Sequence, residues 1–271
     1  MRSVQRIDEY KFDAQNEIVH LTNWIKDYFV NNGDHNTKAI IGISGGKDST
    51  IAAALLVRAL GPDRVIGVMM PQGEQKDIED AKRVCEILNI ESVEVNIGHT
   101  CDILYAAMTK GCGLAVEDIY NNSTIQTNTP ARIRMTTLYA VAALYHGRVC
   151  NTGNRSELYV GYTTKYGDLA GDFALLKEYT VSEVLKLGEA LTELPKELVF
   201  KTPADGLSGL SDEENLGFSY HQVDNLLLFG IVPEMEAFEK IKAAHRRNRH
   251  KDCIHLPAPL KSDWYNDHWE F

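Results

Sequence analysis

The chain has 271 residues, of which 44% are apolar, and this is enough to bury one large core. Its formal net charge of -10 argues against a broad nucleic-acid-binding surface, because such surfaces need many lysines and arginines. No apolar run reaches the roughly 18 residues of a membrane span, and the N-terminal segment lacks the apolar core of a signal peptide. The five cysteines form no CxxC pair, which argues against a zinc ribbon. We therefore expect a cytoplasmic protein with neither nucleic-acid nor membrane partners.

Helix and strand patterns alternate along the chain. Apolar positions at helical spacing predict a helix over residues 8–31, and the apolar run KAIIGI predicts a buried strand over 38–43. An Ala- and Leu-rich helix follows and ends near Gly61. The later predictions are a strand over 64–70, a helix over 75–89, a strand over 92–97, a helix over 131–147, a strand in RVCNTG and terminal helices within 218–248. This alternation predicts an α/β fold, a doubly wound parallel sheet with helices on both faces and a helical C-terminal extension.

We expect a single domain over residues 1–271, because the sequence contains neither an internal repeat nor a low-complexity tract. Its expected parts are an N-terminal helix (1–33), an α/β core (38–200), a mobile loop (201–217) and C-terminal helices with a tail (218–271). In a doubly wound sheet, ligands bind beyond the carboxyl ends of the strands. Residues 44–49 and 151–157 each lie at the end of a predicted strand, so both segments are candidate parts of a site.

The sequence IIGISGGKDST, residues 40–50, joins the first strand to its helix. It is not a Walker A loop, because Ile41 stands where that pattern requires glycine and Asp48 where it requires a hydroxyl residue. Its glycines, hydroxyls and helix start still suit a phosphate. A carboxylate among phosphate donors repels the ligand unless a cation lies between them, so we interpret Asp48 as a Mg²⁺ ligand. The alternative, a simple turn in which Asp48 caps the helix, stays open.

The motif SGGKDS after a strand resembles the PP-loop of the ATP pyrophosphatases, which have an adenine nucleotide alpha hydrolase-like fold and adenylate a substrate. Downstream segments are similar, in order and spacing, to the ammonia-dependent NAD synthetases: NTPARIRM (128–135), NTGNRSE (151–157), GYTTKYGDLAGDF (161–173), TPADGL with SDEENLGFSY (202–220) and HK (250–251). The resemblance covers roughly residues 10 to 260. It implies that ATP adenylates the carboxylate of nicotinic acid adenine dinucleotide (deamido-NAD) and that ammonia then displaces AMP to form NAD.

The resemblance also implies roles for individual residues. The phosphates of ATP would be cradled by Gly42, Ile43, Ser44, Gly45, Gly46, Lys47, Asp48 and Ser49, with Ser44, Lys47 and Asp48 as the catalytic group. Mg²⁺ would be bound by Asp48 and Glu157, and the rest of ATP by Gln75, Thr152 and Lys177. The deamido-NAD substrate would be held by Arg132, Lys165 and Asp172, and by His250 and Lys251 reaching across the interface of a homodimer.

Two positions depart from the family pattern. Val181 stands where an ATP-binding lysine is common, and Pro203 where a threonine near the phosphates is common. Lys177 and Thr202 are the candidate replacements. Ammonia is expected to arrive free or from another protein, because a glutamine-dependent enzyme needs a further amidotransferase domain with its own nucleophile.

Other interpretations stay open. Glu157 and Arg132 fit ordinary solvated charges, and the basic stretch 240–251 fits a helix end at which the helix dipole favours cations. At the level of function, the alternatives are another PP-loop adenylating ligase and a non-catalytic ATP-binding sensor. A tRNA-modifying ligase would be expected to carry a basic RNA-binding module or a reactive cysteine pair, neither of which the sequence contains. A sensor has less need of two metal-binding carboxylates.

Overall fold

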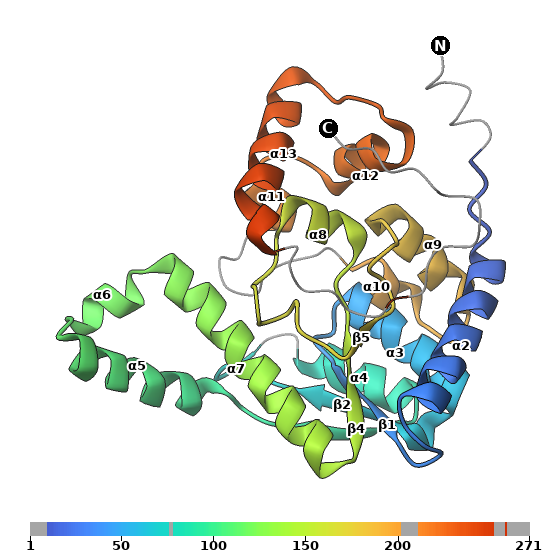
Figure 1. Cartoon of the computed structure of the whole chain (residues 1–271), viewed down its shortest axis with the longest axis horizontal. Helices are drawn as coiled ribbons and strands as arrows, with labels where there is room; N and C mark the ends of the chain where they lie inside the picture. The colour runs from blue at the N-terminus through green and yellow to red at the C-terminus, as the bar shows by residue number, and fades with distance from the viewer. Residues whose placement is uncertain (1–9, 76–77, 202–210, 252–257, 259–271) are drawn as a thin grey trace.

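A five-stranded parallel sheet forms the centre of the molecule (Figure 1). The computed structural model describes residues 10–75, 78–201, 211–251 and 258. The strands are β1 (Lys38–Gly42), β2 (Val65–Met69), β3 (Glu91–Glu94), β4 (Gly147–Asn151) and β5 (Phe173–Ala174), in the spatial order β3-β2-β1-β4-β5. The chain adds β2 and β3 on one side of β1 and then crosses to the other side with β4. This reversal creates a topological switch point between β1 and β4, where ligands bind in doubly wound sheets.

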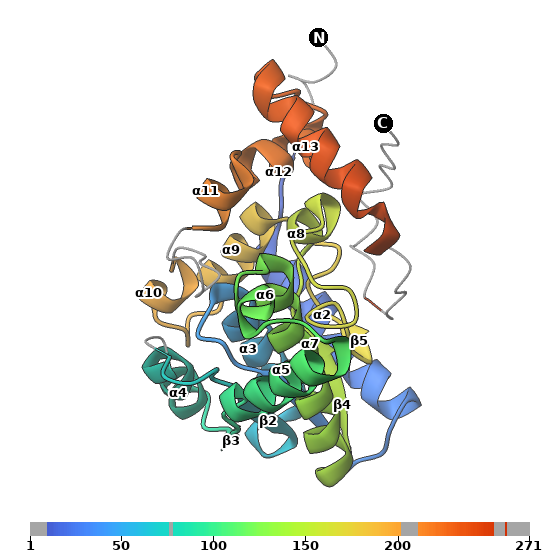
Figure 2. The same ribbon diagram turned by 90° about the vertical axis from the view of Figure 1, so that its left-hand side faces the viewer.

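Helices cover both faces of the sheet (Figures 1 and 2). One face is covered by α2 (Ala14–Asn31), α3 (Lys47–Leu60), α4 (Ile78–Ile87), α9 (Val181–Ala190) and α10 (Lys196–Val199). The other face is covered by α7 (Ser123–Leu144) and the start of α5 (Gly98–Cys112), and α6 (Val116–Tyr120) connects these two helices. The remaining elements are α8 (Arg155–Val160), α11 (Asp212–Leu216), α12 (Tyr220–Phe229), α13 (Met235–Asn248) and the 3-10 turns η1 (Pro62–Arg64) and η2 (Arg249–Lys251). The predicted fold class is confirmed.

The two faces of the sheet bury separate apolar clusters. Ile40 and Ile41 are adjacent in β1 and both fully buried, because successive side chains of a strand point to opposite faces. Ile41 packs in the cluster that includes α2, α3 and α9, and Ile40 packs in the cluster that includes α5 and α7. A third cluster joins α8 to α12 and α13 through side chains such as Val160 and Ile241. The continuous apolar run KAIIGI thus reflects a strand covered on both sides.

Some element predictions differ from the structure. Helix α7 begins at Ser123, before the predicted residue 131, because the Asn122 side chain accepts a hydrogen bond from the backbone N–H of Ile125 (3.1 Å) and caps the helix there. Residues 212–216, predicted to lie in a mobile loop, form α11, which Ser211 and Glu214 stabilise as a capping box. The other part of that loop, 202–210, lies outside the described residues, as do the candidate Thr202 and its neighbour Pro203.

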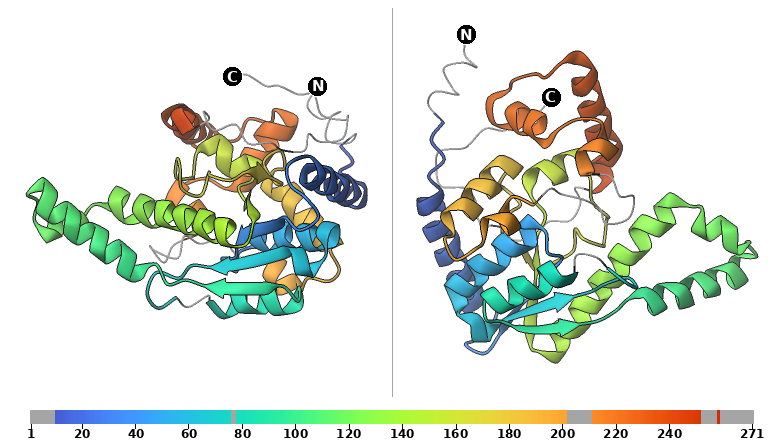
Figure 3. Two further views of the ribbon diagram at one scale, coloured as in Figure 1. Left: turned by 60° about the horizontal axis from the view of Figure 1, so that its bottom comes forward. Right: turned by 180° about the vertical axis from the view of Figure 1, so that it is seen from behind.

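Helices α5, α6 and the first half of α7 project from the body as an arm (Figures 1 and 3). Helix α5 was not predicted from the sequence, because several of its apolar side chains are exposed rather than confined to one buried stripe. Ile103, for example, is 58% exposed. Within the described ranges, no helix combines the length and apolar content that crossing a membrane requires.

Gly188 in α9 allows a close approach between this helix and its neighbours α3 and α10. An added Cβ would lie 2.6 Å from Cγ1 of Val199 and 2.7 Å from Cδ1 of Ile51. We therefore expect Gly188→Ala to lower the free energy of unfolding, measured by urea denaturation, by about 1–3 kcal/mol. The control is Gly111→Ala in α5, where an added Cβ meets nothing within 4 Å. It should raise the free energy of unfolding by up to about 1 kcal/mol, and destabilisation by both variants would contradict the packing argument.

Candidate active site

The loop between β1 and α3 has the backbone shape of an anion cradle. Gly45 has a φ of +77°, in the left-handed region that favours glycine. The Ser44 hydroxyl accepts a hydrogen bond from the backbone N–H of Gly46 (3.2 Å) and lies 3.2 Å from the Ser49 hydroxyl. No side chain caps α3 at Gly46, so the first N–H groups of this helix remain available to a phosphate.

Lys47 and Asp48 form an ion pair at the start of α3. The Lys47 side chain is only 4% exposed, and its Nζ lies 2.7 Å from Oδ2 of Asp48. Desolvation acts to lower the pKa of Lys47, but the charges of Asp48 and Glu157 act in the opposite direction and the net pKa is raised. Lys47 therefore carries a fixed positive charge beside the phosphate loop.

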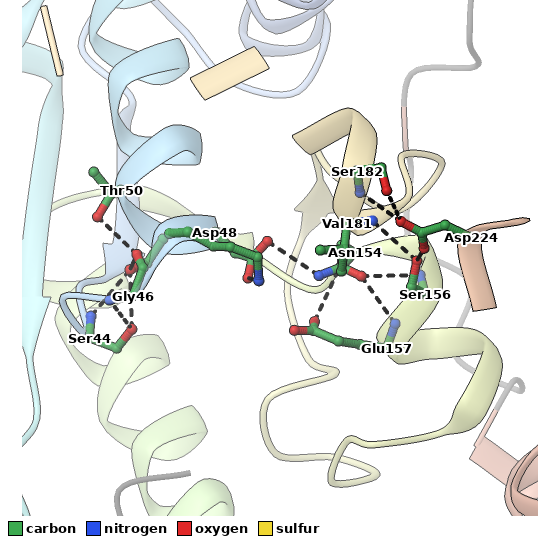
Figure 4. Close-up of polar contacts among 12 residues, drawn as sticks. Ser44, Gly46, Asp48, Thr50, Asn154, Ser156, Glu157, Val181, Ser182 and Asp224 are labelled. Carbon is green, nitrogen blue, oxygen red and sulfur yellow. Dashed lines mark hydrogen bonds and ion pairs between the residues drawn. The ribbon is translucent and has the colours of Figure 1, made fainter. Parts of the chain in front are cut away.

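The segment after β4 forms a capping box at the start of α8. The Oδ1 atom of Asn154 accepts hydrogen bonds from the backbone N–H groups of Ser156 (3.1 Å) and Glu157 (3.0 Å). The Glu157 carboxylate accepts one in return from the backbone N–H of Asn154 (3.3 Å). The Nδ2 atom of Asn154 donates to Oδ1 of Asp48 (3.2 Å; Figure 4). The segments after β1 and β4 are thus joined at the switch point of the sheet.

The electrostatics of this junction favour a cation. Desolvation raises the pKa of Glu157 to about 8, with a further contribution from the negative charge of Asp48. A divalent cation between the two carboxylates would relieve both effects. Across the described residues, no three His, Cys, Asp or Glu side chains gather into a metal cluster. The pair of carboxylates nevertheless fits Mg²⁺, which commonly takes one or two protein carboxylates and completes its coordination with phosphates and water.

Four of the predicted substrate-binding residues are linked by contacts that reach the end of α8. The Nε atom of Arg132 in α7 donates to the carbonyl oxygen of Lys165 (3.2 Å), and Nζ of Lys165 donates to that of His250 (2.8 Å). The Nζ atom of Lys251 donates to the carbonyl oxygen of Gly161, directly after α8 (2.6 Å). All of these contacts lie within one chain. The participation of His250 and Lys251 in a second copy's site stays a prediction.

The other predicted residues have different surroundings. Gln75, Thr152 and Lys177 follow β2, β4 and β5, so all three stand at the carboxyl edge of the sheet, and their contacts with ATP stay predictions. Asp172 instead precedes β5. Its carboxylate accepts hydrogen bonds from the backbone N–H of Val149 (2.7 Å) and from the Tyr139 hydroxyl (3.4 Å). The structure therefore places the Asp172 carboxylate against β4 and α7.

Three polar residues around the junction were not singled out from the sequence. Asn154 had a local signal, because Asn followed three positions later by Glu is a capping-box pattern. Ser156 and Asp224 had none. Their side chains form a buried hydrogen bond between α8 and α12, two helices whose proximity depends on the tertiary fold (Figure 4).

The comparisons with known proteins agree with this geometry. The family described as NAD synthase matches residues 17–254. The chain belongs to the NAD synthase family. Among its curated relatives, the NH(3)-dependent NAD(+) synthetase of Methanoregula boonei is 38% identical over 227 residues, covering 81% of this chain and 86% of the relative. The family prediction from the sequence is therefore confirmed.

Two solved structures share this fold. The structure of NMN synthetase from Francisella tularensis has a TM-score of 0.80 and 32% identity, and covers 91% of this chain and 98% of that one. The NAD+ synthetase from Burkholderia pseudomallei has a TM-score of 0.73 and 30% identity, with 90% and 92% coverage. As a member of the NAD synthase family, the chain is a ligase with ATP as its co-substrate. The sensor alternative is thereby set aside.

Proposed function

We propose that this NAD synthase family member amidates deamido-NAD with ammonia and releases AMP and pyrophosphate. The substrate carboxylate attacks the α-phosphorus of ATP, and pyrophosphate leaves. Ammonia then attacks the carbonyl carbon of the mixed anhydride, and AMP leaves with the C–O bond electrons. The observation that carries the proposal is the junction of Asp48 and Glu157 beside the phosphate loop. The function named for the Methanoregula relative supports the same reaction.

The chain's own groups suit a reaction that depends on positioning and charge. The N–H groups at the start of α3 would hold the triphosphate, and the ammonium group of Lys47 would offset charge that develops on the leaving pyrophosphate. Asp48 and Glu157 would hold Mg²⁺, which would offset part of the negative charge of the triphosphate. Arg132, Lys165 and the segment at 250–251 would supply positive charge for the anionic dinucleotide. No covalent bond to the protein is needed at any step.

A second candidate substrate is nicotinic acid mononucleotide. The observation behind it is the name of one similar structure, the NMN synthetase of Francisella tularensis, which is 32% identical and has a TM-score of 0.80. The amidation chemistry would be the same for both acids, since each presents the same pyridine carboxylate. Only contacts with the second nucleotide of deamido-NAD would separate them.

The test is the release of AMP and pyrophosphate from ATP in saturating ammonium with Mg²⁺, with products identified by mass. Three reactions are compared: with deamido-NAD, with nicotinic acid mononucleotide, and without an acceptor. We expect AMP release to depend on deamido-NAD and to match the NAD formed. A kcat/KM that is higher for nicotinic acid mononucleotide than for deamido-NAD would show that the chain makes NMN rather than NAD. AMP release with neither acid would refute both.

We also infer that two copies of the chain pair through the surface formed by the arm and the second half of α7. Large apolar side chains are exposed on this surface, and an apolar groove there is lined mainly by α7, with Thr100 of α5 and Val95 after β3. The exposed side chains are Ile103, Leu104, Leu114, Val116, Tyr120 and Leu144. Exposed apolar surface of this kind marks interaction sites, and a second copy offers a matching arm.

Leu144, 80% exposed at the end of α7, provides the test of this pairing. We expect Leu144→Glu to raise the dissociation constant of the dimer at least about tenfold, because a carboxylate would have to be desolvated in the interface. Sedimentation velocity over a range of concentrations measures this. The control is Val30→Glu on α2, which is 77% exposed on the opposite side of the sheet. A monomeric wild-type chain, or equal effects of the two variants, would contradict the pairing.

A further inference from the structure

Asn154 is the residue that contacts both carboxylates of the proposed Mg²⁺ site. Its side-chain Nδ2 donates to Oδ1 of Asp48 at 3.2 Å, and its backbone N–H donates to Oε2 of Glu157 at 3.3 Å. Asp48 and Glu157 are carried by separate elements, α3 and α8, which follow neighbouring strands. The distance between the two carboxylates is therefore bridged by one residue, Asn154, which hydrogen-bonds to both.

The orientation of the Asn154 amide is determined by its neighbours. Its Oδ1 faces the backbone N–H groups of Ser156 and Glu157, which can only donate. Its Nδ2 then faces Asp48, whose Oδ1 accepts the hydrogen bond. The side chain is fully buried, so water does not compete for these bonds. The amide of Asn154 accepts the hydrogen bonds that cap α8 and also donates one to Asp48. A Ser hydroxyl or an Asp carboxylate at this position would keep at most the bonds that cap α8.

The helix that carries Glu157 is held from behind as well. Ser156 donates its hydroxyl to Asp224 of α12, and the same carboxylate accepts hydrogen bonds from the backbone and hydroxyl of Ser182 in α9 (Figure 4). The backbone N–H of Val181 donates to the Ser156 hydroxyl (3.1 Å). Because α8 is anchored in this way, the position of Asn154 is fixed, and its hydrogen bond restricts the position of the Asp48 carboxylate.

We propose that Asn154 is a positioning residue that sets the distance and orientation of Asp48 and Glu157 for Mg²⁺. This inference rests on the proposed function of the site, since it concerns the same cation. Partners that hydrogen-bond to metal ligands fix their direction, and removing one commonly weakens metal affinity by about 10- to 100-fold. Asn154 would act through the two carboxylates and would not itself touch the metal.

The test compares Asn154→Ser with the wild type. Serine also caps helices, so the start of α8 is kept while the bond to Asp48 is lost. Isothermal titration calorimetry gives the Kd of α,β-methylene-ATP, which cannot be cleaved between its α and β phosphates, once in excess Mg²⁺ and once in EDTA. The Kd in EDTA divided by the Kd in Mg²⁺ measures how much the cation strengthens nucleotide binding. This readout needs no turnover.

We expect Asn154→Ser to lower this ratio about tenfold or more while the Kd in EDTA stays within about twofold. A purely structural role would weaken both Kd values by the same factor and leave the ratio unchanged, which would overturn the proposal. The matched control is Asn122→Ser, the same change at the cap of α7, where the side chain has no carboxylate partner in the described contacts. A similar fall in its ratio would also overturn the proposal.

The failure of the proposed metal site itself would look different. In that case the wild-type ratio would already be close to one, whatever residue stands at position 154. If Asn154→Ser does not fold, as judged by circular dichroism and gel filtration, Asn154→Thr replaces it, because threonine is the other hydroxyl residue that caps a helix without an amide donor. The same ratio then decides between positioning and a structural role.

Discussion

Asp48→Asn is expected to lower the rate of AMP release roughly 10²- to 10³-fold, the scale on which loss of one group that stabilises transition-state charge slows an enzyme. The carboxylate accepts hydrogen bonds from Lys47 and Asn154 and is the proposed Mg²⁺ ligand in the phosphate loop. Asparagine keeps the shape but removes the negative charge, so the cation loses an anionic ligand and Lys47 its ion pair. Single-turnover AMP formation with saturating deamido-NAD measures the effect.

The fold should survive this substitution, because Asp48 lies at the first turn of α3 and makes no apolar core contact. The control is Asp63→Asn, an exposed aspartate at the opposite end of the sheet, which should leave AMP release unchanged. Both variants should melt within a few degrees of the wild type. A folded Asp48→Asn protein with near-wild-type AMP release would refute the assigned role.

Asp224→Ala is expected to cause the largest loss of stability, about 3–5 kcal/mol in the free energy of unfolding. The Asp224 carboxylate is 1% exposed and accepts hydrogen bonds from the Ser156 hydroxyl and from the backbone N–H and hydroxyl of Ser182. Alanine would leave these buried donors without an acceptor and open a cavity between α8, α9 and α12. Each unsatisfied buried group costs about 1–3 kcal/mol.

Urea denaturation followed by circular dichroism measures this loss. The control is His221→Ala, an exposed residue on the same helix, for which a change below about 1 kcal/mol is expected. If the two variants lost the same free energy, the buried network would not be stabilising α8. Loss of Mg²⁺-dependent nucleotide binding in the folded fraction of Asp224→Ala would further connect this network to Glu157.

Much of the fold follows from short-range patterns. The run KAIIGI and the glycine-containing loop after it specify a buried strand, a turn and a helix start within about a dozen residues. The same holds for the strand that ends at Asn151 and for the capping box of α8. These patterns depend on side-chain alternation and on backbone hydrogen bonds between near neighbours, so they can be recognised without the tertiary structure.

Hydrophobic periodicity predicted the secondary structure least well where the side chains of a helix do not divide into a buried and an exposed face. Helix α7 carries apolar residues on several sides, and its start depends on Asn122, which lies before the predicted boundary. The arm's exposed apolar residues look like core residues in the sequence, because hydrophobicity alone does not tell a core face from a face that meets another molecule.

The sequence by itself determined the class of fold, the phosphate loop and the family resemblance. Only the tertiary structure decided that Asn154 joins Asp48 to Glu157 and that Asp224 anchors α8, the helix that carries Glu157. The physical reason is strand order. The hydrogen bond from Asn154 to Asp48 exists because β4 pairs with β1. An apolar strand that is buried on both faces could pair equally well with several other strands, so its sequence does not specify its neighbour. Which neighbour it takes is set by the packing of the whole chain, and that choice assembles the site.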